Sequence, residues 1–208
     1  MQHFICIAGN VGAGKTSLTK LLAQRMGWKP LFEPVDHNPY LIEFYQNMTR
    51  WSFHSNVAFL SHHARQHSES LRTNTPIVQD RSIYEHAEIF AYNAYRQGYM
   101  TSRDWNLYCT LYETFKSLLP IPDLLVYLRA SVSTLIKRVA QRDLSFDRVT
   151  SVEYISQLNE LYENWISRAV SCKILTLNTE NLDFVNNHEH LEAAISNILS
   201  VLPSKSLD

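Results

Sequence analysis

The stretch that decides the fold is Phe4-Ile-Cys-Ile-Ala-Gly9-Asn-Val-Gly-Ala-Gly14-Lys15-Thr16-Ser17. Its second half completes the pattern G-x-x-x-x-G-K-[ST], in which glycines let backbone N–H groups turn toward an anion and the following helix adds its positive N-terminal dipole. The run before the first glycine is apolar, which is typical of a strand buried on both faces of a parallel sheet. The sequence therefore predicts a strand, a phosphate-binding loop and a helix, in that order.

This loop is expected to hold the phosphates of a nucleoside triphosphate, either ATP or GTP. Lys15 is expected to reach the β- and γ-phosphates, and the Thr16 hydroxyl is expected to ligate magnesium. The donor-binding residues predicted here are Gly9, Asn10, Val11, Gly12, Ala13, Gly14, Lys15, Thr16 and Ser17.

Length and composition limit the organisation of the chain and its partners. At 208 residues, 45% of them apolar and 19% charged, the chain fits one globular domain spanning 1–208, with a lid at about 138–148. The net charge of −1 provides no field for a nucleic-acid backbone, and no run of lysine and arginine forms a local patch. We therefore expect small-molecule ligands and no polymeric nucleic acid.

Cysteine usage and hydropathy indicate a cytoplasmic protein that is not in a membrane. Cys6, Cys109 and Cys172 are odd in number and lack C-x-x-C spacing, so reduced thiols are expected rather than disulfides or a zinc site. The first glycine comes too soon for a signal peptide, and no apolar stretch approaches about 18 residues.

Short apolar runs alternate with longer helical patterns along the whole chain. This order predicts an α/β three-layer sandwich with a five-stranded parallel sheet. The predicted strands are 4–8, 31–32, 76–79, 124–128 and 173–177, and the predicted helices are 16–26, 51–71, 83–96, 103–119, 132–141, 152–170 and 191–201. Ligands of such sheets sit beyond the carboxyl ends of the strands.

Polar residues that follow the second and third strands favour a kinase over a switch GTPase. Glu33 would lie near a γ-phosphate, where it can accept a proton from an attacking hydroxyl. Asp80 would face the metal, and Arg81 would bridge the donor phosphate and the acceptor oxygen. The Asn-Lys-x-Asp segment that a guanine-specific switch needs is absent from the sequence.

An arginine-bearing segment interrupts two predicted helices at 141–148 and suits a flap over the phosphates. Arg138 and Arg142 are i, i+4 neighbours, so both guanidinium groups can clamp phosphate oxygens from one helix face. The alternative that they are solvated surface arginines remains open at this point.

Five stretches, in the correct order, resemble the deoxynucleoside kinase family, most closely its bacterial deoxyadenosine and deoxyguanosine kinase branch. They are 9–17, 33–41, 44–45 with 50–53, 79–85 with 89–91, and 162–167. The resemblance implies transfer of the γ-phosphate of ATP, with Mg2+, to the 5′-hydroxyl of a deoxynucleoside. It also implies a homodimer.

The resemblance assigns further roles to individual residues. Glu33 would be the general base, Asp80 the acidic residue beside magnesium, and Arg81 the contact to the 5′-oxygen. Tyr45 and Asp147 would hold the sugar 3′-hydroxyl, although the family usually has glutamate at the second position. The remaining matches are Phe90 stacked on the substrate base, Arg138 and Arg142 as lid arginines, and Asn181, Leu182 and Asp183 in the loop around the ATP adenine.

Departures from the family pattern concentrate where the base is read. Asn56, His63 and His86 stand where the family commonly has glutamine, arginine and aspartate, and Leu144 replaces a third lid arginine. These exchanges change both charge and hydrogen-bonding pattern. We expect a purine substrate, with deoxyadenosine favoured, read by these three residues.

Two alternatives share the fold. A nucleoside monophosphate kinase would need extra basic residues near Glu33 for the acceptor phosphate, and 33–41 contains no lysine or arginine. A non-catalytic interaction protein would not need the complete set of reactive residues that this chain carries, namely Lys15, Thr16, Glu33, Asp80 and Arg81.

Overall fold

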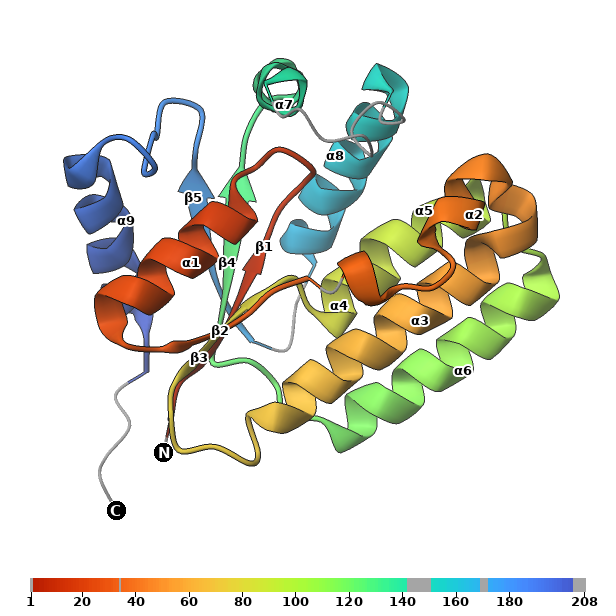
Figure 1. Ribbon diagram of the computed structural model, residues 1–208, viewed down its shortest axis with the longest axis horizontal. Helices are drawn as coiled ribbons and strands as arrows, with labels where there is room; N and C mark the ends of the chain where they lie inside the picture. The colour runs from red at the N-terminus through yellow and green to blue at the C-terminus, as the bar shows by residue number, and fades with distance from the viewer. Residues whose placement is uncertain (1, 34, 142–150, 169–171, 204–208) are drawn as a thin grey trace.

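A single parallel sheet of five strands forms the centre of the molecule (Figure 1). The computed structural model describes residues 2–33, 35–141, 151–168 and 172–203. The strand order is β2-β3-β1-β4-β5. The strands are β1 Phe4–Ala8, β2 Lys29–Leu31, β3 Ile77–Asp80, β4 Leu124–Arg129 and β5 Lys173–Asn178. The predicted fold class is therefore confirmed, with the bounds of β2, β3, β4 and β5 shifted by at most two residues.

The described helices follow the predicted order, with two short additions before α3. They are α1 Lys15–Met26, η1 Val35–His37, α2 Leu41–Gln46, α3 Met48–Glu69, α4 Ile83–Glu85, η2 His86–Ala91, α5 Tyr92–Arg96, α6 Ser102–Leu118, α7 Val132–Ala140, α8 Val152–Ser167 and α9 His188–Val201. The predicted helix 83–96 is present as α4, η2 and α5, because η2 is a π-helical turn. No described helix has both the length and the apolar character that crossing a membrane requires.

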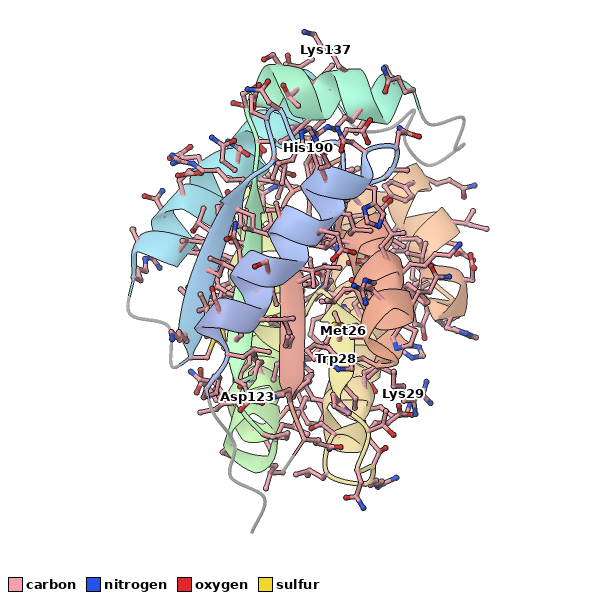
Figure 2. All side chains as sticks on the ribbon, turned by 90° about the vertical axis from the view of Figure 1, so that its left-hand side faces the viewer. Met26, Trp28, Lys29, Asp123, Lys137 and His190 are labelled. Atoms are coloured by element: carbon pink, nitrogen blue, oxygen red, sulfur yellow. The ribbon has the colours of Figure 1, made fainter. Side chains whose placement is uncertain are left out.

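Both faces of the sheet are buried, which explains the unbroken apolar run of β1. Phe4 and Cys6 point into a core that also contains residues of α3, α6 and α8, whereas Ile5 and Ile7 point into a second core with α1, α7 and α9. Figure 2 shows the second face, where α9 and α1 lie over the strands. An ion pair between Arg25 of α1 and Glu192 of α9 joins these two helices. The sheet is thus the middle layer between two helical layers.

The strand order brings the carboxyl ends of β1, β2 and β3 together. Ile7 in β1 is in register with Asp80, the last residue of β3, and Leu31 in β2 is in register with Gln79. The phosphate-binding loop leaves β1 at this edge, and Glu33 follows β2 by two residues. Ligand sites in open α/β sheets lie at this kind of edge.

Candidate active site

The loop between β1 and α1 has the backbone geometry of an anion cradle. Gly12 and Gly14 have φ of 82° and 95°, in the region that only glycine enters easily. A Cβ on Gly12 would lie 2.8 Å from the carbonyl oxygen of Leu135 in α7. Glycine is therefore required at position 12 both by the backbone turn and by the packing of α7 against the loop.

Lys15 is buried beneath this loop, with 6% of the residue exposed. Its Nζ donates a hydrogen bond to the carbonyl oxygen of Asn10 at 3.0 Å. Burial, assisted by Arg81, lowers the pKa of Lys15 to about 8, while the carboxylates of Asp80, Glu85 and Glu33 oppose that shift. The ammonium group therefore remains the predominant form at pH 7 and can bind an anion.

Thr16 and Asp80 form an oxygen-rich pair at the start of α1. The Thr16 hydroxyl donates to Oδ2 of Asp80 at 2.5 Å. Oδ1 of Asp80 is buried and has no hydrogen-bond partner within the described ranges. Burial raises the pKa of Asp80, and the cation of Lys15 opposes it. An unpartnered carboxylate oxygen beside a hydroxyl is a donor set that suits Mg2+, which commonly takes one or two carboxylates plus phosphate oxygens.

Arg81 holds Glu33 at the mouth of the site. Arg81 Nε lies 2.7 Å from Oε2 of Glu33, and the guanidinium lies 4.4 Å above the ring of Phe90. Burial acts to raise the pKa of Glu33, but Arg81 and Lys15 bring it below its ordinary value, so this carboxylate is ionised at neutral pH. Arg81 has φ of 69°, a strained conformation that costs about 1–3 kcal/mol.

Glu85 and Tyr162 are buried behind Arg81 and contact it from the interior of the protein. The sequence alone assigned no role to either residue. Oε1 of the fully buried Glu85 accepts hydrogen bonds from Gly9 N at 3.2 Å and from Arg81 Nη1 at 2.8 Å. The Tyr162 hydroxyl contacts the same Oε1 and lies 2.9 Å from Gly9 O. The i, i+4 spacing of Arg81 and Glu85 was a signal for their ion pair.

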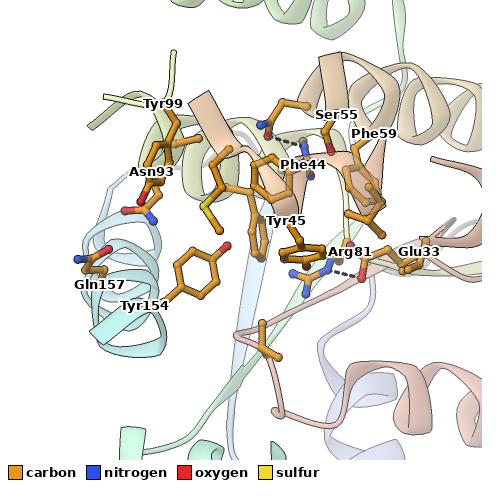
Figure 3. Close-up of a pocket in the computed structure, with 18 of the residues that line it drawn as sticks. Glu33, Phe44, Tyr45, Ser55, Phe59, Arg81, Asn93, Tyr99, Tyr154 and Gln157 are labelled. Atoms are coloured by element: carbon orange, nitrogen blue, oxygen red, sulfur yellow. Dashed lines mark hydrogen bonds and ion pairs between the residues drawn. The ribbon is translucent and has the colours of Figure 1, made fainter. Parts of the chain in front are cut away.

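A cavity of about 480 Å³ opens beside Glu33 and Arg81 (Figure 3). It reaches the phosphate-binding loop at Gly12, Lys15 and Thr16. The predicted substrate residues that line it are Tyr45, Asn56, His86 and Phe90, and unpredicted lining residues include Ser55, Phe59, Asn93, Tyr154 and Gln157. The volume and the mixture of aromatic rings with a few polar groups are typical of a small-molecule site.

On one wall of the cavity, the side-chain amide of Asn56 is hydrogen-bonded to both Ser52 and His86. Asn56 Nδ2 donates to the carbonyl oxygen of Ser52 at 2.8 Å, and Asn56 Oδ1 lies 3.1 Å from His86 Nε2. Since Oδ1 is an acceptor, Nε2 of His86 carries the proton. His63 lies behind this wall rather than on it, because it is fully buried with its ring centroid 5.7 Å from that of His86.

Three buried histidines are uncharged at neutral pH, namely His86 on this wall, His63 behind it and His67 one turn further along α3. Burial lowers the pKa of His63 to about 4 and that of His67 to about 3. Burial, with His63 and Arg81, also lowers the pKa of His86 well below its ordinary value. The wall of the cavity therefore presents dipoles and no imidazolium charge.

These histidines are expected to destabilise the protein in mild acid. Below pH 6.5 these histidines become protonated in the unfolded chain but stay neutral in the folded chain. Their contribution to the free energy of unfolding is therefore complete above pH 6.5 and is lost as the pH falls toward 4. Between pH 7 and pH 5 the free energy of unfolding should fall by about 2 kcal/mol for His63 and by the same amount for His67, as measured by urea denaturation. His67→Gln should flatten this slope, whereas His188→Gln, on a side chain 81% exposed, should not. A slope that is equal in all three proteins would contradict the assignment.

The first residue of the predicted lid contacts the chain just before the predicted adenine loop. Arg138, on α7, donates from Nη1 to the Thr179 hydroxyl at 3.2 Å and from Nη2 to the Thr179 carbonyl. Thr179 lies two residues before the segment of Asn181, Leu182 and Asp183, in which Asp183 Oδ1 accepts hydrogen bonds from the N–H groups of Val185 and Asn186. Arg142 and Asp147, together with the lid segment 142–150, lie outside the described residues.

The fold and the site together define a P-loop phosphotransferase with a cavity for a small acceptor. The comparisons identify its relatives. The family model for deoxynucleoside kinases matches residues 5–203. The chain is 38% identical to the deoxyadenosine/deoxycytidine kinase of Bacillus subtilis, over 97% of this chain and 94% of that one. It is 33% identical to the deoxyadenosine kinase of Lactobacillus acidophilus, over 90% of both chains.

A solved structure agrees with these relatives. The deoxyadenosine kinase from M. mycoides with dCMP and dCDP bound superposes with a TM-score of 0.82 at 25% identity, covering 95% of this chain and 99% of that one. The chain belongs to the deoxynucleoside kinase family. The expected kinase activity on nucleosides is thereby confirmed, and the two alternatives that share the fold are set aside.

Proposed function

We propose that this deoxynucleoside kinase transfers the γ-phosphate of ATP to the 5′-hydroxyl of a deoxynucleoside, with deoxyadenosine favoured. The observation that carries the proposal is the Glu33–Arg81 ion pair, at 2.7 Å, between the phosphate-binding loop and the cavity. A carboxylate and a guanidinium at that junction would meet the acceptor hydroxyl and the transferring phosphate together. The test is ADP release with ATP and Mg2+ on each of the four deoxynucleosides, where absence of turnover on all four would refute the proposal.

Each charged residue has a separate task in this reaction. Glu33, ionised and fixed by Arg81, would accept the proton of the 5′-hydroxyl. Arg81 and Lys15 would stabilise the charge on the phosphoryl oxygens as the bond to the donor breaks. Because the protein forms no covalent bond to the transferred phosphoryl group in this reaction, positioning and electrostatic stabilisation provide most of the catalysis.

The residues that would hold magnesium are Thr16 and Asp80. The unpartnered Oδ1 of Asp80 and the adjoining Thr16 hydroxyl support this role. When bound, the ion would neutralise charge on the donor phosphates. Among the described residues, no cluster of three or more His, Cys, Asp or Glu side chains forms a further metal site.

The lid and the loop after β5 would close over the donor. We propose that Arg138 and Arg142 clamp phosphate oxygens from a lid at about 138–148 within a single domain. Asn181, Leu182 and Asp183 would surround the ATP adenine. The contact of Arg138 with Thr179 supports a connection between these two parts of the donor site.

The sugar and the base of the acceptor would bind in the 480 Å³ cavity. Tyr45, which lines it, would contact the 3′-hydroxyl together with Asp147. Phe90 would stack on the base, since its ring lies on the cavity wall next to Arg81 and nearly parallel to His86. His63 would act from behind the wall through its contact with His86 rather than by touching the base.

The Asn56 amide supports a base with an amino group beside a ring nitrogen. Besides its bonds to Ser52 O and His86, Asn56 has one acceptor lone pair and a second N–H, whose contact is a long one to the Ser52 hydroxyl at 3.4 Å that a base can replace. That combination pairs with adenine, whereas guanine is usually read through O6 and N7 by arginine or lysine. His63 and His86, both uncharged, supply no such cation. Cytosine offers the same edge as adenine, and the B. subtilis relative is named for both nucleosides.

Restoring the family's side chains on this wall should change base preference. The triple variant Asn56→Gln, His63→Arg and His86→Asp introduces a longer amide and an ion pair, so the ratio of kcat/KM for deoxyadenosine to that for deoxyguanosine should shift by about tenfold or more. Competition between the two nucleosides measures the ratio directly. His62→Arg, a neighbouring change off the cavity wall, is the matched control. An unaltered ratio in the triple variant would show that the wall does not select the base.

We also propose a cytoplasmic homodimer that acts in nucleotide salvage. The three cysteines are free, which suits a reducing compartment. Leu107 and Leu118 on α6 are 51% and 70% exposed. The tryptophan-bearing helix α6 would supply the face between subunits, because exposed apolar side chains on one helix are typical of such contacts.

A further inference from the structure

Glu85 is a buried carboxylate at the back of the site, and it connects the donor side with the acceptor side. It is fully buried, and its Oε1 receives hydrogen bonds from Gly9 N and from Arg81 Nη1. Gly9 is the first residue of the phosphate-binding loop, and Arg81 pairs with Glu33 at the acceptor cavity. A single oxygen atom thus contacts both halves of the site.

Tyr162 closes this connection from α8. Its hydroxyl accepts a hydrogen bond from Arg81 Nη1 at 3.1 Å and lies close to two acceptors, Glu85 Oε1 and Gly9 O at 2.9 Å. The ring is fully buried and stacks on Tyr127 with centroids 5.7 Å apart. Tyr162 therefore has little freedom to move, and its position determines where Arg81 Nη1 lies.

The conformation of Arg81 requires such support. Its φ of 69° is strained for a residue with a side chain, and strain of this kind persists only where the surroundings determine the conformation. Glu33 holds Nε from the cavity side, while Glu85 and Tyr162 hold Nη1 from the interior. The interior pair fixes the guanidinium independently of the cavity, where substrate would arrive.

We propose that Glu85 and Tyr162 are positioning residues, which hold the Arg81 guanidinium in a fixed relation to the first glycine of the phosphate-binding loop. This inference rests on the proposed role of Arg81 at the acceptor oxygen. Neither Glu85 nor Tyr162 lines the 480 Å³ cavity. They act through Arg81, so their replacement should slow the phosphoryl-transfer step.

The test compares turnover with donor binding in Tyr162→Phe and Glu85→Gln. A displacement of a reacting group by about 1 Å costs on the order of 10²-fold in rate. We expect kcat to fall by about 10- to 100-fold in both variants, while KM for ATP and the affinity for ATP by equilibrium dialysis stay near their original values. Tyr127→Phe is the matched control, since it removes another buried tyrosine hydroxyl, bonded to Glu163 at 3.1 Å and stacked on Tyr162, and should retain kcat.

The double variant and Arg81→Gln separate the possible outcomes. If both residues act through Arg81, the double variant should lose little more than the worse single variant, because their effects are not additive. If Arg81→Gln keeps its turnover, the proposed role of Arg81 fails. If Arg81→Gln loses turnover while Tyr162→Phe keeps it, only the positioning inference is overturned. Equal losses of kcat and of ATP affinity would also overturn it, and Tyr162→Phe decides the matter if thermal melting shows that Glu85→Gln does not fold.

Discussion

Replacing Lys15 by methionine is expected to lower kcat by on the order of 10³-fold, the largest effect of any single change considered for this protein. Lys15 is buried under the phosphate-binding loop and reaches the cavity beside Gly12 and Thr16. Methionine has a similar shape but no charge, so the loop can keep its fold while the transferring phosphoryl group loses a cation. Stopped-flow or steady-state turnover with saturating ATP measures the loss.

The control for this change is Lys20→Met, on the exposed side of the same helix. It removes one lysine from α1 without touching the loop, and it should leave kcat unchanged. Retention of kcat within about tenfold in Lys15→Met would contradict a role at the γ-phosphate, because a lost transition-state donor costs at least 10²-fold.

Glu33→Gln is expected to reduce kcat by on the order of 10²-fold or more while leaving ATP affinity intact. Glutamine matches glutamate in size and can still accept a hydrogen bond from Arg81, but it cannot take the proton of the acceptor hydroxyl. Glu33 follows β2 and is not part of the phosphate-binding loop, so donor binding should be spared. Turnover and ATP affinity measured on the same preparation separate these two effects.

Asp36→Asn is the matched control for this carboxylate. Asp36 is exposed, lies three residues further along the same segment, and does not line the 480 Å³ cavity. It should behave as the unaltered protein. If Glu33→Gln turns over at the original rate, then Glu33 is not the base, and its ion pair with Arg81 has only a structural role.

The fold was predictable because its signals are local. The apolar run of β1, the glycines after it and the helical spacing in α1 each depend on neighbours in the chain, and both elements lie within a residue of the predicted bounds. The short elements η1 and α2 were not predicted, since contacts from elsewhere help to hold them. Asn38, for example, donates to Ser55 O at 3.1 Å across 17 positions.

The charged residues at the strand ends were more predictable than the buried residues behind them. Asp80 ends a strand, and Glu33 and Arg81 follow strands, and the rule for parallel sheets places the ends of such strands at one edge. Glu85 and Tyr162 meet across 77 positions, a contact that no periodicity encodes. His63 was expected on the cavity wall, but a sequence pattern does not show which face of α3 packs inward at that turn, and the side chain lies in the core.

The close approach of α7 to Gly12 has an evolutionary consequence. A side chain at position 12 would meet the Leu135 carbonyl oxygen at 2.8 Å, so selection for folding preserves this glycine even without selection for catalysis. In a descendant that had lost its activity, Lys15 and Glu33 would drift while Gly12 would persist. Persistence of Gly12 in a descendant would therefore indicate retention of the fold, whereas persistence of Lys15 and Glu33 would indicate retention of activity.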